Sequence, residues 1–418
     1  MTTVSAPTAA PHAPERPAHR DGNVLRWVGA YTASMMGDNI YFLSLSWAAV
    51  QSGTPAQAGL VTAVSAVPRT LLLLGGGVIA DRFGPRRVVI GSDTVRCAAV
   101  LAVAALLFVT RPGLWPLTAL ALVFGTVDAV FMPAVGALPA RITAPGQLAR
   151  VQGMRGMAMR FANIAGAPLG GLGVALGGTA AAFTLAGLLI AVSVPLLISL
   201  RVREPAPDHA PGAGRTTPWR DLRDGLRYIR GHRVLAPLIA AIALGDLGFV
   251  GPLNVGLTLL ADERGWGASG MGWVLAGFGT GAAVAALVLT VRGRLPHAGR
   301  LAGVTVLAGS AAMGALAYVP DLLAAVGAAL LVGLLTGLSG FLAGALLQTQ
   351  SDPAYLGRVS AVASLVSLGV APLSMPLSAA AIGAWGTRPV FTVSAAVCAL
   401  GGVVALYVRD LRRAQLPG

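Results

Sequence analysis

Long apolar runs dominate this chain and decide what it can fold into. Of its 418 residues, 55% are hydrophobic and only 11% are charged, whereas soluble domains carry roughly 25% charged residues. Several runs reach the ~20 residues that a helix needs to cross a bilayer. A transmembrane β-barrel would show alternating segments of about ten residues instead. The sequence therefore predicts an all-α integral membrane protein, and it excludes a soluble enzyme, a DNA-binding domain and a secreted disulfide scaffold.

Twelve apolar spans are predicted, joined by short connections except for one long segment between the sixth and seventh spans. The pattern divides the chain into a disordered tail, six spans, a linker, six more spans and a second tail. The corresponding domains are 1–24, 25–200, 201–233, 234–408 and 409–418. The spans themselves are predicted at 26–50, 57–80, 88–110, 115–140, 149–176, 179–200, 234–260, 266–291, 301–319, 321–348, 356–384 and 387–408.

The arginines predict the orientation of these spans. All 30 Lys+Arg residues are arginine, and most of them lie in cytoplasmic segments if the N-terminus is cytoplasmic. Only Arg111, Arg264 and Arg388 then lie in external loops. Because cytoplasmic loops carry an excess of positive residues, both termini are expected in the cytoplasm, with the protein multi-pass in the cell inner (plasma) membrane. The net charge of +14 is scattered over these loops, so no nucleic-acid partner is expected.

The linker contains a predicted amphipathic helix. Trp219, Leu222, Leu226 and Ile229 recur at helical spacing, and four arginines lie off that stripe. Such a helix is expected on the anionic cytoplasmic leaflet of the lipid bilayer, where it would tether the two halves.

The two halves repeat at an offset of 208 residues. Gly37-Asp38 recurs as Gly245-Asp246. Further matches in the same register pair Gly125, Gly136 and Pro168 with Gly333, Gly344 and Pro376. Parallel six-helix repeats related by an axis along the membrane normal are the plan of one large class of secondary transporters.

A motif between the second and third spans resembles motif A of the major facilitator superfamily. It consists of Gly77, Asp81-Arg82, Gly84 and the basic pair Arg86-Arg87. With the stretches Gly37–Trp47 and Leu346–Arg358, it is most similar to the bacterial drug-efflux branch that includes exporters of macrolides and of enterobactin. The resemblance covers roughly 25–410.

The resemblance implies the major facilitator fold, with twelve transmembrane helices in two pseudo-symmetric six-helix bundles, in a monomer. It further implies that Gly77 packs closely against the eleventh span and that Asp81 lies near that span's N-terminus, where the helix dipole favours a carboxylate. The motif would then latch the inner gate closed in the outward-facing state. The alternative is a basic loop that only sets topology.

A second motif, in the fifth span, resembles the antiporter motif of the same family. It contains Gly166, Pro168, Gly170 and Gly171, with the proline one position later than in the family pattern. Glycines here would let the helix bend against a neighbour. A tight packing site without a transport role is the alternative.

Three acids are predicted near the bilayer midplane, in spans that line the central cavity in the family. They are Asp38, Asp128 and Asp246, in our order of preference as proton carriers. Ionisable groups at this depth cost at least ~2.5 kcal/mol and are functional candidates. They could instead be counter-charges for a cationic substrate, or static ion pairs with Arg69 and Arg160. Asp93 and Arg96, three residues apart in one span, are predicted to form a structural pair nearer the cytoplasm, with a relay as the alternative.

Seven further residues could line a substrate cavity, although each could equally be a packing or interhelical hydrogen-bonding residue. No catalytic or metal-binding motif is found, and no cofactor is expected. The seven cavity candidates are Asn39, Tyr41, Trp47, Phe131, Met132, Asn254 and Gln348.

These features favour proton-coupled efflux of a drug, siderophore or other small metabolite by alternating access. Its partners would be a small-molecule substrate and protons. Uptake of a nutrient by the same fold is one alternative, since fold does not fix direction. A non-transporting membrane scaffold or sensor is another. An ATP-driven pump is disfavoured, because a Walker-type loop requires a lysine and the chain has none.

Overall fold

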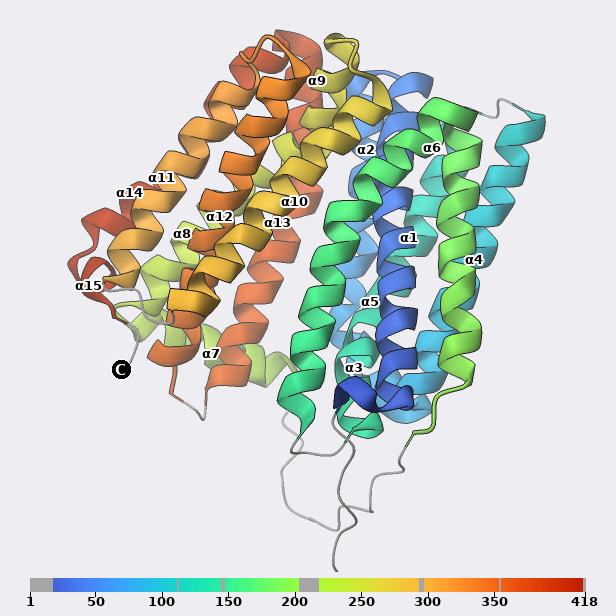
Figure 1. The fold of residues 1–418 in the computed structure, drawn as a ribbon. Coiled ribbons are helices and arrows are strands. Elements are labelled where there is room, and N and C mark those ends of the chain that lie inside the picture. Colours follow the sequence, from blue (N-terminus) through green and yellow to red (C-terminus); the bar gives the residue numbers. More distant parts are fainter. Residues whose placement is uncertain are drawn as a thin grey trace, which may run out of the picture.

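The computed structural model describes residues 18–110, 113–143, 147–202, 218–292, 297–352 and 355–415. Every regular element within these ranges is helical, and Figure 1 shows their arrangement. In chain order, the helices are α1 (Gly22–Ser52), α2 (Pro55–Val64), α3 (Ala66–Phe83), α4 (Pro85–Val109), α5 (Trp115–Ile142), α6 (Leu148–Ile198), α7 (Pro218–Gly231), α8 (Leu235–Gly251), α9 (Leu257–Glu263), α10 (Gly267–Arg292), α11 (Ala298–Leu316), α12 (Leu322–Gln350), α13 (Leu356–Trp385), α14 (Thr387–Tyr407) and α15 (Arg409–Arg413).

These helices form the twelve predicted crossings. Nine continuous helical stretches in the described ranges are long and apolar enough to cross a membrane. One of them, α6, holds two crossings, because Gly178 adopts φ 73° and interrupts its helical geometry. The stretch Leu235–Glu263 is a single crossing in which a π-helical turn at Pro252–Gly256 joins α8 to α9. The remaining two crossings are α1 and the pair α2–α3, so the predicted fold class is confirmed.

The N-terminal tail is shorter than predicted. A 3-10 turn occupies Ala18–Arg20, and α1 already begins at Gly22. The side chain of Asp21 accepts a hydrogen bond from the backbone N–H of Asn23 at 2.8 Å, which caps the first turn. The predicted tail therefore overlaps helical residues from 18 onward, and its remainder, 1–17, lies outside the described ranges.

The helices form two bundles that lie side by side, α1–α6 in one and α8–α14 in the other (Figure 1). We call the side that holds the described chain ends, residues 18–22 and 409–415, the tail side, and the opposite side the far side. The repeat is visible in the packing. A Cβ added to Gly125 of α5 would lie 2.0 Å from the Ser65 carbonyl oxygen, and one added to Gly333 of α12 would lie 1.9 Å from the Phe278 carbonyl oxygen. Equivalent glycines thus allow the same close helix crossing in each bundle.

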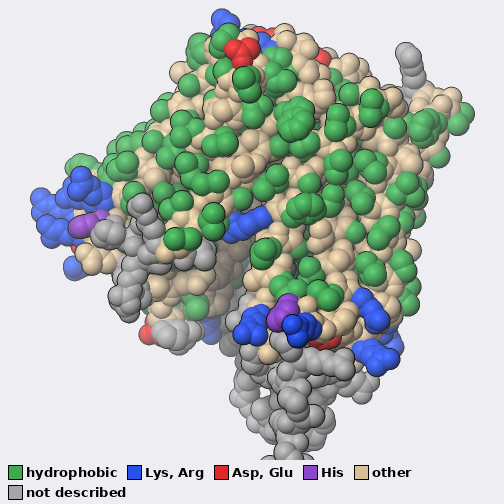
Figure 2. All heavy atoms as spheres, in the orientation of Figure 1, with side chains coloured by type: hydrophobic (Ala, Val, Ile, Leu, Met, Phe, Trp, Pro, Cys, Tyr) green, Lys and Arg blue, Asp and Glu red, His purple; other side chains and the backbone are tan. Residues whose placement is uncertain are grey.

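The two bundles meet at the far side. Gln51 at the end of α1 donates a hydrogen bond to Asp262 of α9 at 2.7 Å. Next to this contact, Leu43 and Trp47 of α1 share one apolar core with Leu257 and Leu260 of α9. Toward the tail side the bundles diverge, and Figure 2 shows a hollow between them there. The space between the bundles is therefore closed at the far side and opens toward the tail side.

Hydrophobic side chains are spread over the visible lateral surface with few charged ones among them, and arginines gather at the tail side (Figure 2). This distribution is that of a protein whose flanks contact lipid, with cationic side chains at one membrane surface.

The linker helix α7 packs against the second bundle on one side and exposes an apolar side chain on the other. Ile229 is buried, and the ring of Tyr228 stacks on that of Tyr355 at the start of α13, with centroids 4.4 Å apart. Leu226 is 46% exposed. The predicted apolar stripe is thus divided between the second bundle and the outside, rather than facing the bilayer throughout. The side chains of Trp219 and Arg220, and residues 203–217, lie outside the described part.

Candidate functional site

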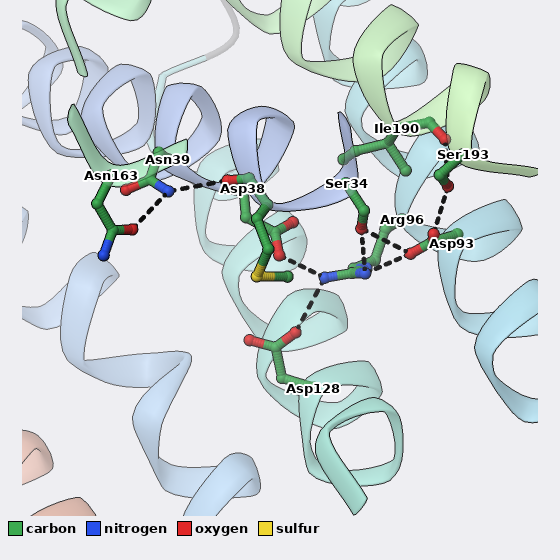
Figure 3. Close-up of polar contacts among 10 residues, drawn as sticks. Ser34, Asp38, Asn39, Asp93, Arg96, Asp128, Asn163, Ile190 and Ser193 are labelled. Carbon is green, nitrogen blue, oxygen red and sulfur yellow. Dashed lines mark hydrogen bonds and ion pairs between the residues drawn. The ribbon is translucent and has the colours of Figure 1, made fainter. Parts of the chain in front are cut away.

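One buried arginine links three carboxylates from three helices of the first bundle (Figure 3). Arg96 on α4 is 0% exposed. Its Nη1 donates to Oδ2 of Asp38 on α1 at 2.7 Å and to Oδ1 of Asp128 on α5 at 3.3 Å, while its Nη2 pairs with Asp93 on α4. We call these four residues the charge cluster. It brings together at one point the helices that carry the acids.

Hydroxyl groups and an aromatic ring hold the cluster in place. Ser34 accepts a hydrogen bond from Nη2 of Arg96 at 3.0 Å and donates one to Asp93 at 3.1 Å. Ser193 of α6 donates to the other carboxylate oxygen of Asp93. The guanidinium carbon of Arg96 lies 3.9 Å from the ring centroid of Phe131, a favourable cation–π distance. Both oxygens of Asp93 thus accept hydrogen bonds, whereas Oδ1 of Asp38 is buried with no hydrogen-bond partner within the described residues.

The predicted partners Arg69 and Arg160 form no direct ion pair with the midplane acids within the described residues, where Asp38 and Asp128 pair with Arg96 instead. Arg69 does interact electrostatically with Asp128, so the prediction is wrong for the direct pairs. The predicted Asp93–Arg96 pair does form, but it belongs to the same cluster as the midplane acids instead of standing apart from them. The packing of α4 against its neighbours directs Arg96 toward α1 and α5. Residue spacing within α4 does not reveal this direction.

The two predicted partners line a cavity between the bundles instead. This cavity has a volume of about 670 Å³, and its wall includes Arg69, Arg160 and Asp128. Arg160 of α6 donates to the backbone carbonyl of Ala282 on α10 at 3.4 Å and lies over the ring of Phe341 on α12, 5.0 Å from its centroid. Arg160 therefore contacts the second bundle across the cavity.

The cavity wall is mixed in character. Polar groups come from both bundles, with Asn39 and Asn163 in the first and Asn254 in the second. Apolar and aromatic groups fill the rest of the wall and include Phe42, Met159, Met271, Leu275, Phe278 and Phe341. Concave sites with apolar walls and a few placed polar groups are typical of small-molecule binding.

Two of the seven predicted cavity residues, Asn39 and Asn254, line the cavity, and five do not. Tyr41, Trp47 and Phe131 are buried in packing; the ring of Tyr41 stacks on Phe124 with centroids 3.6 Å apart. Met132 is half-buried and Gln348 is exposed, both away from this wall.

Several wall residues of α6 were missed by sequence reasoning. Gly156, Met159 and Asn163 line the cavity beside Arg160, which was predicted only as a charge partner. Their spacing of three and four residues places them on one helix face, and the face could have been found by following that period from Arg160.

Asp246 of α8, the predicted counterpart of Asp38, is placed differently. It is half-buried beside the Ser367 hydroxyl and near Cys398. It is not in the cavity wall, and no ion pair joins it to an arginine in the described part of the chain.

The glycines of the fifth crossing pack against both bundles. Added Cβ atoms at Gly166 and Gly170 would lie 2.6 Å from Cβ of Asn39 and 3.3 Å from Cα of Ile40, both on α1. One at Gly171 would lie 2.5 Å from the Ala268 carbonyl oxygen on α10. In return, Gly272 of α10 packs on the Ala167 carbonyl, with 2.6 Å to an added Cβ. Together with Pro168 in the same helix, these small residues permit close contact between the bundles at the far side.

The basic motif is described only in part. Gly84 ends α3 with φ 83°, a value that favours glycine. Arg86 donates to the carbonyls of Leu197 and Ile198 at the end of α6, and Arg82 and Arg87 are exposed. The surroundings of Gly77 and of the Asp81 side chain lie outside the described part, so their predicted contacts with the eleventh span stay predictions.

Two helical bundles around a cavity, with charges buried beside it, define a membrane transporter rather than an enzyme. The sequence matches the Major Facilitator Superfamily over residues 28–371, and the chain belongs to this family.

Curated relatives and solved structures agree with this assignment. The chain is 26% identical over 375 residues to the enterobactin exporter EntS of Shigella boydii serotype 18, covering 85% of this chain and 84% of that protein, and equally so to EntS of Escherichia coli O139:H28. The fold is similar to that of a bacterial homologue of the human lysosomal transporter Spinster in an inward-facing, occupied conformation. That match has a TM-score of 0.74 and 13% identity, and covers 94% of this chain and 97% of the other. The nucleoside transporter NupG matches with a TM-score of 0.67 and 14% identity, covering 94% of this chain and 100% of that one.

Proposed function

We propose that this protein is a proton-coupled exporter of a medium-sized, partly apolar small molecule. One observation carries the proposal: Asp128 belongs both to the cavity wall and to the charge cluster. A change of charge on Asp128 would therefore alter its ion pair with Arg96, and through Arg96 the ion pair with Asp38.

The charges of the cluster suggest how coupling would work. Arg96 offers one positive charge to three carboxylates, and unpaired charges are costly in a membrane interior. A proton on Asp128 would break its ion pair with Arg96, which would then pair only with Asp38 and Asp93. The interaction of α5 with α1 and α4 would weaken as a result. The unpartnered Oδ1 of Asp38 offers a second position for a proton. Proton binding and release would thus change how three helices of the first bundle are held together.

The cavity suggests the substrate class. Its volume of about 670 Å³ fits a drug-sized molecule, and its wall combines aromatic and thioether groups with amides and arginines. The exporters named among the relatives support efflux over uptake. A siderophore, an antibiotic or a related metabolite is consistent with this wall.

The orientation belongs to the same proposal. With the tail side in the cytoplasm of a bacterial cell, at the inner membrane, the cavity is open inward and ready to load a cytoplasmic substrate. The far-side contacts between α1 and α9 would separate when the protein, acting as a monomer, turns outward. Motif A would then close the tail side.

Accumulation of a chemically diverse compound panel tests the proposal. Cells with and without the protein would be compared, each with and without an ionophore. We expect lower accumulation of some compounds in expressing cells, and loss of the difference when the ionophore removes the proton gradient.

Matched variants make this test specific. Asp128→Asn should behave like ionophore treatment, whereas Asp224→Asn, which changes an exposed carboxylate on α7, should retain export at equal membrane abundance. If ionophore and Asp128→Asn both leave accumulation of every extruded compound unchanged, the coupling proposal fails.

A further inference from the structure

A groove on the outer surface of the second bundle combines two arginines with an apolar wall. It lies between α11 and α14 at the tail side and has a volume of about 710 Å³. Its wall consists of Leu307, Val403, Leu406, Tyr407, Arg409 and Arg412. It lies apart from the cavity between the bundles, with which it shares no residue.

Helix length places the two parts of this groove at different membrane depths. The 21 residues of α14 span about 30 Å, the thickness of the hydrocarbon core. With Tyr407 at the end of α14, Arg409 and Arg412 fall at the level of the lipid headgroups, and Val403 falls within the hydrocarbon layer. Tyr407, which is 85% exposed, sits at the boundary where aromatic residues are favoured.

Close helix packing forms the floor of the groove. An added Cβ at Gly402 of α14 would lie 2.8 Å from Cγ of Leu307, and one at Gly303 of α11 would lie 2.8 Å from Leu406. These glycines let α11 and α14 approach each other, so the larger side chains of Leu307 and Leu406 shape the surface on either side of the contact.

The short helix that carries the two arginines is anchored to the second bundle, and neither arginine has a carboxylate partner among the described residues. α15 is anchored by Leu411, which is buried, and by a hydrogen bond from the Gly299 backbone N–H to the Ala414 carbonyl at 3.2 Å. Arg409 and Arg412 are exposed, and no ion pair is formed by either within the described ranges. Arg300 and Arg413 are exposed as well, and Asp410 is the one acid within α15. Figure 2 shows arginines gathered at the edge of the molecule where α15 lies.

We propose that this groove binds an anionic phospholipid, with the phosphate between Arg409 and Arg412 and one acyl chain along Leu307 and Val403. Positive charge at headgroup depth directly above an apolar groove matches the two parts of such a lipid. Basic pockets at helix ends on the cytoplasmic side recognise anionic headgroups in this way. A zwitterionic lipid would gain the apolar contacts but less from the two arginines.

Lipid binding by the full chain tests this proposal. Purified protein would be titrated with phosphatidylglycerol or phosphatidylcholine, and bound lipids would be counted by native mass spectrometry. We expect preference for phosphatidylglycerol in the wild type. The double variant Arg409→Gln/Arg412→Gln should reduce that preference about fivefold for each arginine lost.

The control variant is Arg20→Gln/Arg26→Gln, which removes the same charge from two exposed positions at the tail side of the first bundle and should keep the preference. A parallel titration with glycerol 3-phosphate distinguishes a headgroup-only anion site from a lipid site; we expect it not to displace phosphatidylglycerol. Equal preference in the wild type and the Arg409/Arg412 variant, equal loss in the control, or displacement by the soluble phosphate would overturn the proposal. Since the groove is separate from the cavity, these outcomes are independent of the export assay.

Discussion

The two bundles share a repeat but differ in how they treat charge. In the first, Asp38 and Asp128 meet around Arg96. At the equivalent positions of the second, 208 residues later, stand Asp246, which has no arginine partner among the described residues, and Thr336, whose hydroxyl donates to the Val332 carbonyl of its own helix at 2.7 Å.

The third crossing of each bundle makes the contrast clearest. α4 carries Arg96 deep in the membrane, whereas the only arginine of α11, Arg300, lies in its first turn at the tail side. The shared glycines preserve helix packing in both bundles, but among the described residues a fully buried arginine is found only in the first bundle. We infer that the first bundle handles protons and that the second contributes mainly cavity wall and movement.

The largest expected effect is loss of Arg96. Arg96→Met would leave three buried carboxylates without a cation, and breaking a buried pair costs about 3–5 kcal/mol. We expect poor expression and a markedly lower melting temperature in detergent. The triple variant Arg96→Met/Asp38→Asn/Asp128→Asn should recover much of that stability. It neutralises two of the three carboxylates, and the third, Asp93, keeps the hydrogen bonds from Ser34 and Ser193. No recovery in the triple variant would mean that Arg96 acts through packing alone.

A smaller effect on stability but a large one on transport is expected for Asp128→Asn. The variant keeps a side chain of equal size while removing the charge that joins cavity and cluster. Efflux driven by a proton gradient should fall about tenfold or more, one order of magnitude per ~1.4 kcal/mol of lost coupling. Initial efflux rates in cells of matched expression measure this, and an unchanged rate contradicts the coupling role of Asp128.

An intermediate effect, on the opening of the far side, is expected when the contact between the bundles there is disturbed. Gly272→Val would force its side chain against the Ala167 carbonyl, so the variant should favour the state in which the far side is open. Labelling of a single cysteine introduced near this contact should increase severalfold. Gly340→Val is the control, because no atom lies within 4 Å of an added Cβ there; equal labelling of the two variants would count against this gate.

The smallest effect is expected at Asp246. Asp246→Asn removes a carboxylate that lies outside both the cavity wall and the charge cluster. Efflux should stay within about twofold of the wild type, measured as for Asp128. A loss as large as that of Asp128→Asn would show that both bundles carry protons and would remove the contrast between them.

The sequence predicted the architecture well because membrane crossing is a local constraint. Each span needs its own apolar length, and the break at Gly178 fell between two predicted spans. Arginines in short loops gave a clear orientation prediction. The repeat matched Gly125 with Gly333, and the structure shows that both lie against a neighbouring backbone carbonyl.

The site was harder to predict because it depends on rotation of helices about their axes. Spacing within α4 predicted the pair Asp93–Arg96 but not the reach of Arg96 to α1 and α5. Arg69 and Arg160 were predicted as partners because they lie at a similar membrane depth to the acids. The orientation of their helices places both arginines in the cavity wall. Tyr41 was predicted as a wall residue with packing as the alternative, and its ring lies against Phe124.

Proton-driven accumulation in proteoliposomes tests the central claim most directly. Purified wild-type protein and Asp128→Asn would be reconstituted with a substrate found in the accumulation panel, and a pH gradient would be imposed. The account predicts that the wild type concentrates the substrate against its gradient, whereas Asp128→Asn only equilibrates it. Equal concentration by both proteins would contradict the claim that Asp128 joins the cavity to the proton path.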